Sequence, residues 1–232
     1  MASHTNPARP GLAGFLGDAL GQLRDSRWLP IGLLFLVFLG GTNAVLALLK
    51  PAPGAAPGAL FAAAGLVRLA AAVSISVAAL RIATGSPRRT WIPDGGFWLY
   101  FLLGLPGLAV TASVAWVGRD LPLLGRILAM EFAAVALLAP FAVWFVAVAV
   151  ERPLAFVPRF RRIGAWLPAL LLWSLLLVAP LAALHAWLSQ RMLDLAGSGG
   201  FWPLAAADAV DSTLFVLLAL ALRVTAYRVA QG

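Results

Sequence analysis

The chain has 232 residues, of which 62% are hydrophobic and only 11% are charged, and its mean hydropathy is +0.94. A soluble domain of this size could not bury so much apolar surface, and the absence of cysteine excludes disulfides and thiolate chemistry. The formal net charge of +8 is almost all arginine in short segments beside apolar runs, which favours a role in membrane topology and not in nucleic-acid binding.

The first 27 residues comprise a polar tail and an amphipathic segment. Residues 1–10 are polar and contain proline, and we predict that they are disordered. In residues 11–27 apolar side chains recur at helical spacing, while Asp18, Gln22 and Asp25 face away from them. This pattern predicts an amphipathic helix that lies in the membrane interface.

Six continuous apolar runs follow, each long enough to cross a hydrocarbon core of about 30 Å at about 1.5 Å per residue. They predict an all-α polytopic membrane protein with a transmembrane domain over residues 28–222 and a cytoplasmic tail over 223–232. The runs are continuous and not alternating, which argues against a β-barrel. The expected spans cover residues 28–49, 59–80, 96–117, 124–150, 164–188 and 203–222.

The connectors between these spans are short, so we expect six transmembrane helices arranged as three antiparallel hairpins. Twelve of the 17 basic residues fall on one side of the spans and four on the other, while Arg68 lies within a span. Because basic loops are retained in the cytoplasm, this bias predicts that both termini are cytoplasmic. Arginine outnumbers lysine sixteen to one, which indicates a GC-rich bacterial genome and hence a bacterial inner membrane.

Three prolines fall inside the expected spans: Pro106, Pro140 and Pro180. Each removes a helix hydrogen bond and favours a kink. A kink either opens a cavity between helices or is packed around, and the sequence leaves both outcomes open.

Five titratable residues lie within the expected spans, most of them in the outer half. A charge near mid-bilayer costs about 2.5–3.5 kcal/mol on insertion scales, so Arg68 should pair with one of the acids. The group is then an ion-pair latch that fixes helix packing or a hydrated, outward-facing pocket for a cation, amine or proton; alternatively, Asp208 already lies in water. The candidate residues are Arg68, Glu131, His185, Asp208 and Asp211.

Basic residues near the predicted cytoplasmic side are candidates for contact with anionic lipid headgroups. Simple topology signalling is the alternative explanation for them. These candidates are Arg88, Arg89, Arg159, Arg161 and Arg162.

The sequence contains no phosphate-binding loop, nucleophile elbow, zinc-protease motif or dinucleotide fingerprint. His185 has no second ligand at helical spacing, so we expect no metal site. We therefore expect no cofactor and no catalytic residues.

The middle of the chain resembles a known group of six-span bacterial proteins. In that group a span ends in a glutamate, a short amphipathic segment with an alanine and a basic patch follows, and the chain re-enters the membrane. The residues at those places are Glu151, Ala155, Arg161 and Arg162, and the closing segment with Tyr227 and Arg228 is also similar. The chain thus resembles the YciC-like proteins and the membrane domain attached to some glycerophosphodiesterases. The resemblance implies a membrane-embedded role and supplies no catalytic residues.

Three functional hypotheses follow. The first is a non-enzymatic accessory, assembly or envelope-homeostasis protein that contacts anionic lipid or a membrane-protein partner. The second is a small transporter, or the substrate-binding membrane subunit of one, that uses an outward-facing acidic pocket. The third, a membrane enzyme acting on lipid with an aspartate as base, has the least support because no motif accompanies it.

Overall fold

The computed structural model describes residues 11–51, 56, 58–150, 162–196 and 198–231. Within these ranges the regular secondary structure is entirely helical. Six helices are long and apolar enough to cross a membrane, which confirms the predicted all-α class and indicates a multi-pass membrane protein. These candidate spans are Trp28–Leu48, Ala59–Thr84, Gly95–Val114, Leu124–Val150, Ile163–Asp194 and Phe201–Gln231.

The helices are numbered in chain order, and two candidate spans are each built from more than one helical piece. Residues 1–10, predicted to be disordered, lie outside the described ranges. The elements are α1 (Leu12–Leu23), α2 (Trp28–Leu48), α3 (Ala59–Thr84), α4 (Gly95–Val117), α5 (Leu123–Leu138), η1 (Ala139–Phe141), α6 (Ala142–Val150), α8 (Ile163–Trp173), η2 (Ser174–Val178), α9 (Ala179–Asp194) and α10 (Phe201–Gln231).

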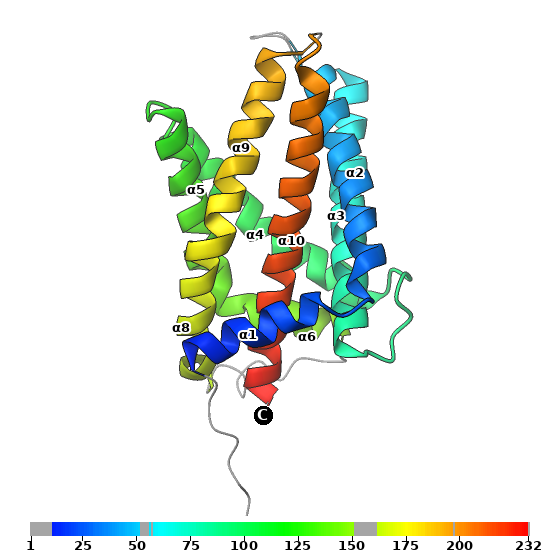
Figure 1. Cartoon of the computed structure of the whole chain (residues 1–232), viewed down its shortest axis with the longest axis vertical. Helices are drawn as coiled ribbons and strands as arrows, with labels where there is room; N and C mark the ends of the chain where they lie inside the picture. The colour runs from blue at the N-terminus through cyan, green and yellow to red at the C-terminus, as the bar shows by residue number, and fades with distance from the viewer. Residues whose placement is uncertain (1–10, 52–55, 57, 151–161, 197, 232) are drawn as a thin grey trace, which may run out of the picture.

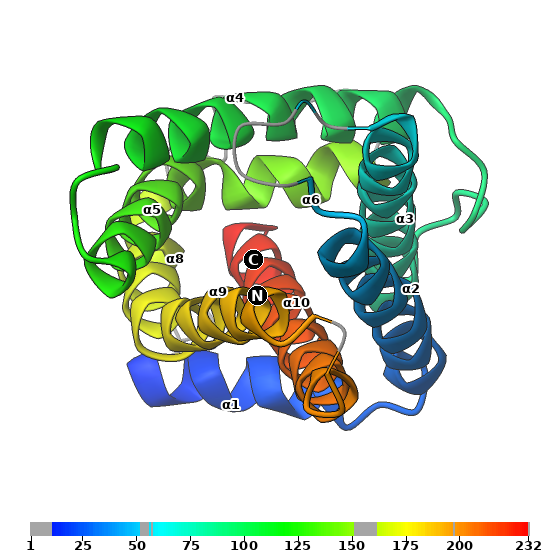
Figure 2. The ribbon, with the colours of Figure 1, turned by 90° about the horizontal axis from the view of Figure 1, so that it is seen from above.

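The last helix, α10, is the centre of the bundle. It packs against α1, α2, α3, α6, α8 and α9. Seen from above, α2 and α3 lie on one side of it, and α5, α8 and α9 lie on the other (Figure 2). The helices α4 and α6 run along the top of this view. The short helix α1 crosses the bundle near the end where α10 finishes (Figure 1). Any polar group on the inward faces of α10 is therefore enclosed by other helices.

Two of the three span prolines coincide with irregular turns. Pro140 lies in the 3₁₀ turn η1, and Pro180 is the second residue of α9, which begins directly after the π-helical turn η2. A proline lacks the N–H that would bond to the carbonyl four residues earlier, so the local hydrogen-bond pattern changes. Pro106, by contrast, lies inside α4, which continues through it as α-helix.

Several helices extend beyond the expected spans, and α10 extends furthest. It continues to Gln231, through most of the segment predicted as a tail. Val224 and Ala226 are fully buried there, because α10 passes α6 and α1 before it ends. A hydropathy pattern marks the apolar stretch, whereas packing determines how far the helix continues beyond it.

The apolar core is divided into a large and a small cluster. The large cluster lies towards the α1 end and includes Phe15, Leu80, Val146 and Leu222, each at most 1% exposed. The small cluster lies at the opposite end of α2, α9 and α10 and consists of Ala44, Ala47, Met192, Phe201 and Ala205. On α10, residues 208–213 fall between these two clusters, and this is where the buried polar groups collect.

A close helix crossing holds α2 against α10 beside that polar segment. A β-carbon built at Gly40 of α2 would overlap the β-carbon of Ala209 on α10. Small residues at a membrane helix interface let the backbones approach closely. The crossing brings Asn43, one turn further along α2, next to Asp208.

Candidate functional site

Asp208 is the centre of a buried hydrogen-bond network that joins three helices. Its side chain is 0% exposed. Asn43 of α2 donates from Nδ2 to Oδ2 at 2.7 Å, and the Nδ1 of His185 on α9 lies 2.7 Å from Oδ1. Ser189, one turn along α9, donates to the same Oδ1 at 3.5 Å. Both carboxylate oxygens are therefore engaged by protein groups.

His185 shares its Nδ1 between two partners on α10. Asp208 Oδ1 lies 2.7 Å and Ser212 Oγ 2.9 Å from this one nitrogen. In a serine–histidine–aspartate relay the serine and the carboxylate contact opposite ring nitrogens, so that a proton can pass through the ring. The geometry therefore cannot relay a proton from Ser212 through the imidazole to Asp208, and it serves to clasp α9 to α10.

Asp211 is one turn further along α10 and differs sharply from Asp208. It is 5% exposed, yet among the described residues no donor reaches either of its carboxylate oxygens. His185 attracts it and Asp208 repels it at longer range. A buried acceptor without a donor destabilises a fold by about 1–3 kcal/mol. Asp211 thus contributes nothing to the network that its neighbour anchors.

Arg68 does not form the ion pair that the sequence predicted. Within the described residues no acid approaches its guanidinium to within 4.0 Å, although Asp208 attracts it at longer range. Asn43 and His185 instead bond the two oxygens of Asp208. They come from α2 and α9, which pack more extensively on α10 than α3 does. The buried ion pair is His185–Asp208 when the histidine is protonated.

Glu131 lies apart from Asp208 and lines a cavity of about 170 Å³. The cavity lies between α5, the two irregular turns and α10, and its lining also includes Ser174 and Arg223. Glu131 interacts with His185 only at longer range. The five predicted residues are therefore split into a His185–Asp208 pair, a donor-free Asp211, an unpaired Arg68 and a cavity-lining Glu131.

A second buried charge cluster is centred on Arg81, one of the twelve basic residues that the sequence places on the predicted cytoplasmic side. The Arg81 side chain is 0% exposed. Its guanidinium donates to the backbone carbonyls of Ala149 (3.0 Å), Arg89 (2.8 Å) and Ile92 (3.0 Å), and to Asp94 Oδ1 at 2.6 Å. It thereby ties the end of α3 to the end of α6 and to the loop that leads into α4.

Asp94 completes this cluster and starts α4. Its Oδ1 accepts the backbone N–H of Phe97 at 3.0 Å, so it is the N-cap, and its Oδ2 lies 3.3 Å from Arg88. Partial burial opposes ionisation, but the Phe97 N–H bond together with Arg81 and Arg88 lowers the pKa of Asp94 below its ordinary value.

The five predicted headgroup arginines are in different surroundings. Arg88 is partly buried against Asp94 and the carbonyl of Val148. Arg89 and Arg162 are exposed and point away from the core. Arg159 and Arg161 lie outside the described residues. Arg89 and Arg162 therefore stay candidates for lipid contact, whereas Arg88 belongs to the Asp94 cluster.

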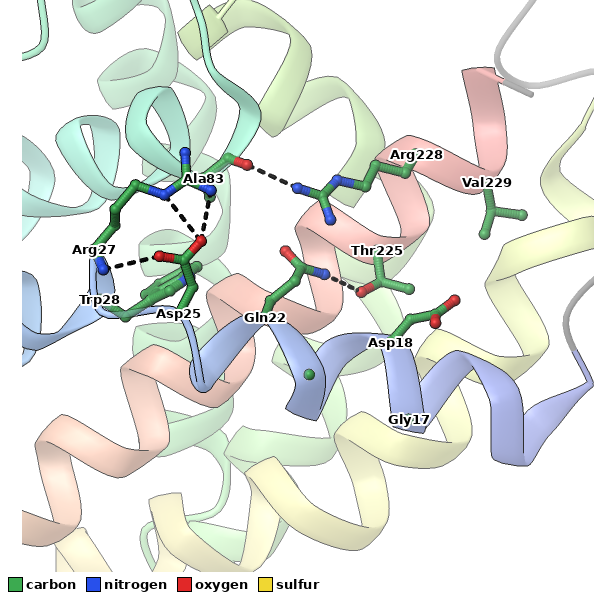
Figure 3. A pocket seen from close by; sticks show the side chains of 11 residues that line it. Gly17, Asp18, Gln22, Asp25, Arg27, Trp28, Ala83, Thr225, Arg228 and Val229 are labelled. Carbon is green, nitrogen blue, oxygen red and sulfur yellow. Dashed lines mark hydrogen bonds and ion pairs between the residues drawn. The ribbon is translucent and has the colours of Figure 1, made fainter.

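A polar pocket of about 580 Å³ lies where α1 meets the ends of α3 and α10 (Figure 3). Gln22 donates to Thr225 Oγ1 at 2.6 Å, and Arg228 donates to the carbonyl of Ala83 at 2.8 Å. At the far end of α1, the indole of Trp173 donates to the carbonyl of Leu12 at 2.9 Å. These bonds fix α1 on the bundle, so the pocket walls are rigidly connected.

Sequence reasoning missed the roles of Asn43, Ser212 and Arg81. A buried amide or hydroxyl in a span is a signal that a partner exists, but it does not identify the partner. For Arg81, the available signal was Asp94, an N-cap aspartate directly before the apolar run Gly95–Val117. Within the described residues no group of three or more histidine, aspartate or glutamate side chains is arranged to hold a metal ion.

Comparisons with protein-family models, with curated proteins and with solved structures found no match. The resemblance to the YciC-like group therefore stays a prediction from the sequence.

Proposed function

We propose that this chain is a non-catalytic integral membrane protein that acts through helix and lipid contacts, as an accessory, assembly or envelope-homeostasis factor. The observation that carries the proposal is the enclosure of Asp208. Its carboxylate is 0% exposed and is bonded by Asn43 and His185 from two other helices. A transported solute would have to displace these partners, at the cost of leaving buried polar groups unpaired. The network therefore suits a packing latch better than a binding pocket.

The enzymatic alternative has less support than the latch. A base that activates water or a lipid hydroxyl must have the reacting group within hydrogen-bond reach and space for the substrate. Asp208 is enclosed, and both partners of His185 share one ring nitrogen. We therefore propose that the polar groups of α9 and α10 stabilise the bundle and do no chemistry.

The second candidate function is a small transporter or the substrate-binding membrane subunit of one. The cavity with Glu131 favours it, because an acid inside a candidate span lines a space of about 170 Å³ beside a 3₁₀ and a π turn. Such irregular turns are frequent at functional sites in helices. The transporter would use Glu131, not Asp208, as its charged group.

A flux measurement separates these two functions. The full chain is reconstituted in vesicles that contain a pH-sensitive dye, and an outward potassium gradient with valinomycin supplies the driving potential. The accessory role predicts no proton flux above that of empty vesicles. A flux that Glu131→Gln abolishes would establish the transporter in its place.

Cysteine accessibility provides an independent test, because the chain has no cysteine of its own. Val135 lines the cavity, whereas Leu137, two residues along α5, is 38% exposed on the outside of the bundle. The accessory role predicts that a membrane-impermeant thiol reagent modifies neither Val135→Cys nor Leu137→Cys in intact vesicles. Modification of Val135→Cys alone would show a water path into the cavity and would contradict the accessory role.

A further inference from the structure

An apolar groove of about 740 Å³ lies on the outer face of the bundle between α1, α2 and α10. Its walls are leucine-rich, and Leu29, Leu33 and Leu214 remain 53–68% exposed along it. In Figure 1, α2 and α10 run side by side above α1, and most of the residues that line the groove come from these three helices. Because α2 and α10 are candidate spans, the groove faces the hydrocarbon region of any membrane they cross.

The floor of the groove is open at a glycine. Gly32 of α2 lines it, and a β-carbon added there would meet Leu217 of α10 at 3.4 Å, an ordinary contact distance. The missing side chain leaves room for a chain to lie along the α2–α10 seam. A β-carbon at position 32 meets a side-chain atom of Leu217 and no backbone atom of α10, so a side chain placed there would occupy the groove.

The groove ends in a polar mouth at the turn between α1 and α2, which contains Arg24, Asp25 and Ser26. Asp25 is already neutralised, since Arg27 forms an ion pair with its Oδ2 at 2.6 Å and donates its backbone N–H to Oδ1 at 3.0 Å. Arg24 is exposed, and within the described residues no acid pairs with it. The mouth therefore presents one uncompensated positive charge beside a hydroxyl.

We propose that this groove binds one anionic phospholipid, with an acyl chain along the α2–α10 seam and the phosphate at Arg24. Apolar walls in a candidate membrane region fit hydrocarbon, and the positive mouth fits an anionic headgroup. A zwitterionic lipid would bind less tightly, because its positively charged ammonium group would be repelled by Arg24. This site rests on the proposed function, for which it names the lipid contact.

The test is native mass spectrometry of the full chain in detergent with equal amounts of phosphatidylglycerol and phosphatidylcholine of the same acyl length. One phosphatidylglycerol should stay bound to the wild-type chain. Arg24→Ala should lower its apparent affinity about fivefold, the factor expected for one basic residue near an anionic headgroup. Arg119→Ala, which removes an arginine whose side chain is 66% exposed outside the groove, is the matched control and should change nothing.

A second pair of variants tests the apolar part. Gly32→Phe fills the groove and should lower binding of both lipids, whereas Gly65→Phe places the same side chain on α3, where nothing lies within 4 Å of the added β-carbon. Equal effects of the two arginine variants, or of the two phenylalanine variants, would overturn the proposal. A dimer that excludes lipid and dissociates in Gly32→Phe would also overturn it, because the occupant would then be a second copy. If no phosphatidylglycerol stays bound and the vesicles show no proton flux, only this inference is refuted. A proton flux that Glu131→Gln abolishes would instead refute the proposed function.

Discussion

Replacing Arg81 by methionine should destabilise the protein strongly, because the arginine is buried and bonded at every branch of its guanidinium. Its side chain is 0% exposed, and five acceptors lose a donor when it is removed: four backbone carbonyls and Asp94. The side chain of Asp94 is 37% exposed, so the loss lies at the lower end of the roughly 3–5 kcal/mol known for a fully buried pair, at about 3 kcal/mol. Methionine keeps most of the volume, so the loss is mainly electrostatic. For a chain of this size, that corresponds to a drop in unfolding temperature on the order of 10 °C.

Arg88→Met is the matched control, since Arg88 pairs with the same carboxylate. Its contact is longer, 3.3 Å against 2.6 Å, and its side chain is 18% exposed. The longer contact and the partial exposure of both side chains weaken this pair, so its loss should lower the unfolding temperature less than the loss of Arg81 does. Thermal unfolding of both variants, followed by tryptophan fluorescence in detergent, gives the two shifts. If Arg88→Met lowered the unfolding temperature as much as Arg81→Met, burial would not be what makes the Arg81 cluster strong.

Three further predictions concern stability in detergent. Asp208→Leu should lower the free energy of unfolding by about 3 kcal/mol, because it leaves Asn43 and His185 without their acceptor. Asp211→Leu should leave the stability unchanged or raise it, because among the described residues no donor reaches Asp211. The unfolding midpoints of the two variants compare them directly, and equal losses would contradict the network. Gly40→Ala should lower the free energy of unfolding by about 1–3 kcal/mol, because the added β-carbon overlaps that of Ala209. An unchanged unfolding midpoint would contradict this and would show that the two helices can move apart at the α2–α10 crossing. The pKa of Asp94 is lowered on folding below its ordinary value of 3.8. The ionised carboxylate therefore stabilises the fold fully above pH 3.8, and this stabilisation is lost as the pH falls through the lower, folded-state pKa. Unfolding midpoints measured from pH 7 to pH 2 should show the loss, and the Asp94→Asn variant should lack this part of the pH dependence.

The sequence predicted the six candidate spans well because a membrane helix is specified by local composition. About twenty apolar residues suffice to mark a span, and each such run became a helix. Each span proline was expected to favour a kink; Pro140 lies in a 3₁₀ turn and a π turn ends two residues before Pro180, since the loss of a backbone N–H is a local effect. Pro106 shows the limit of this rule, because α4 continues through it without a change of helix type.

The partners of the buried charges could not be predicted in the same way. Arg68 was expected to pair because an unpaired charge is unfavourable inside a span, yet Asp208 is satisfied by Asn43 and His185. The sequence identifies which residues need a partner, but the distances between helices decide which partner is reached. The α2–α10 crossing at Gly40 is a property of two helix surfaces together.

The sequence by itself determined the class of molecule, the number of apolar helices and the fact that a few ionic groups lie inside them. These depend on the free energy of transferring each residue from water to hydrocarbon, which is a property of the residue. The tertiary structure decided that α10 is central, that Arg81 is buried at the α1 end, and that the acids are divided between a closed network and a cavity. These depend on which helices touch, because hydrogen bonds and ion pairs act over a few ångströms between residues far apart in the chain.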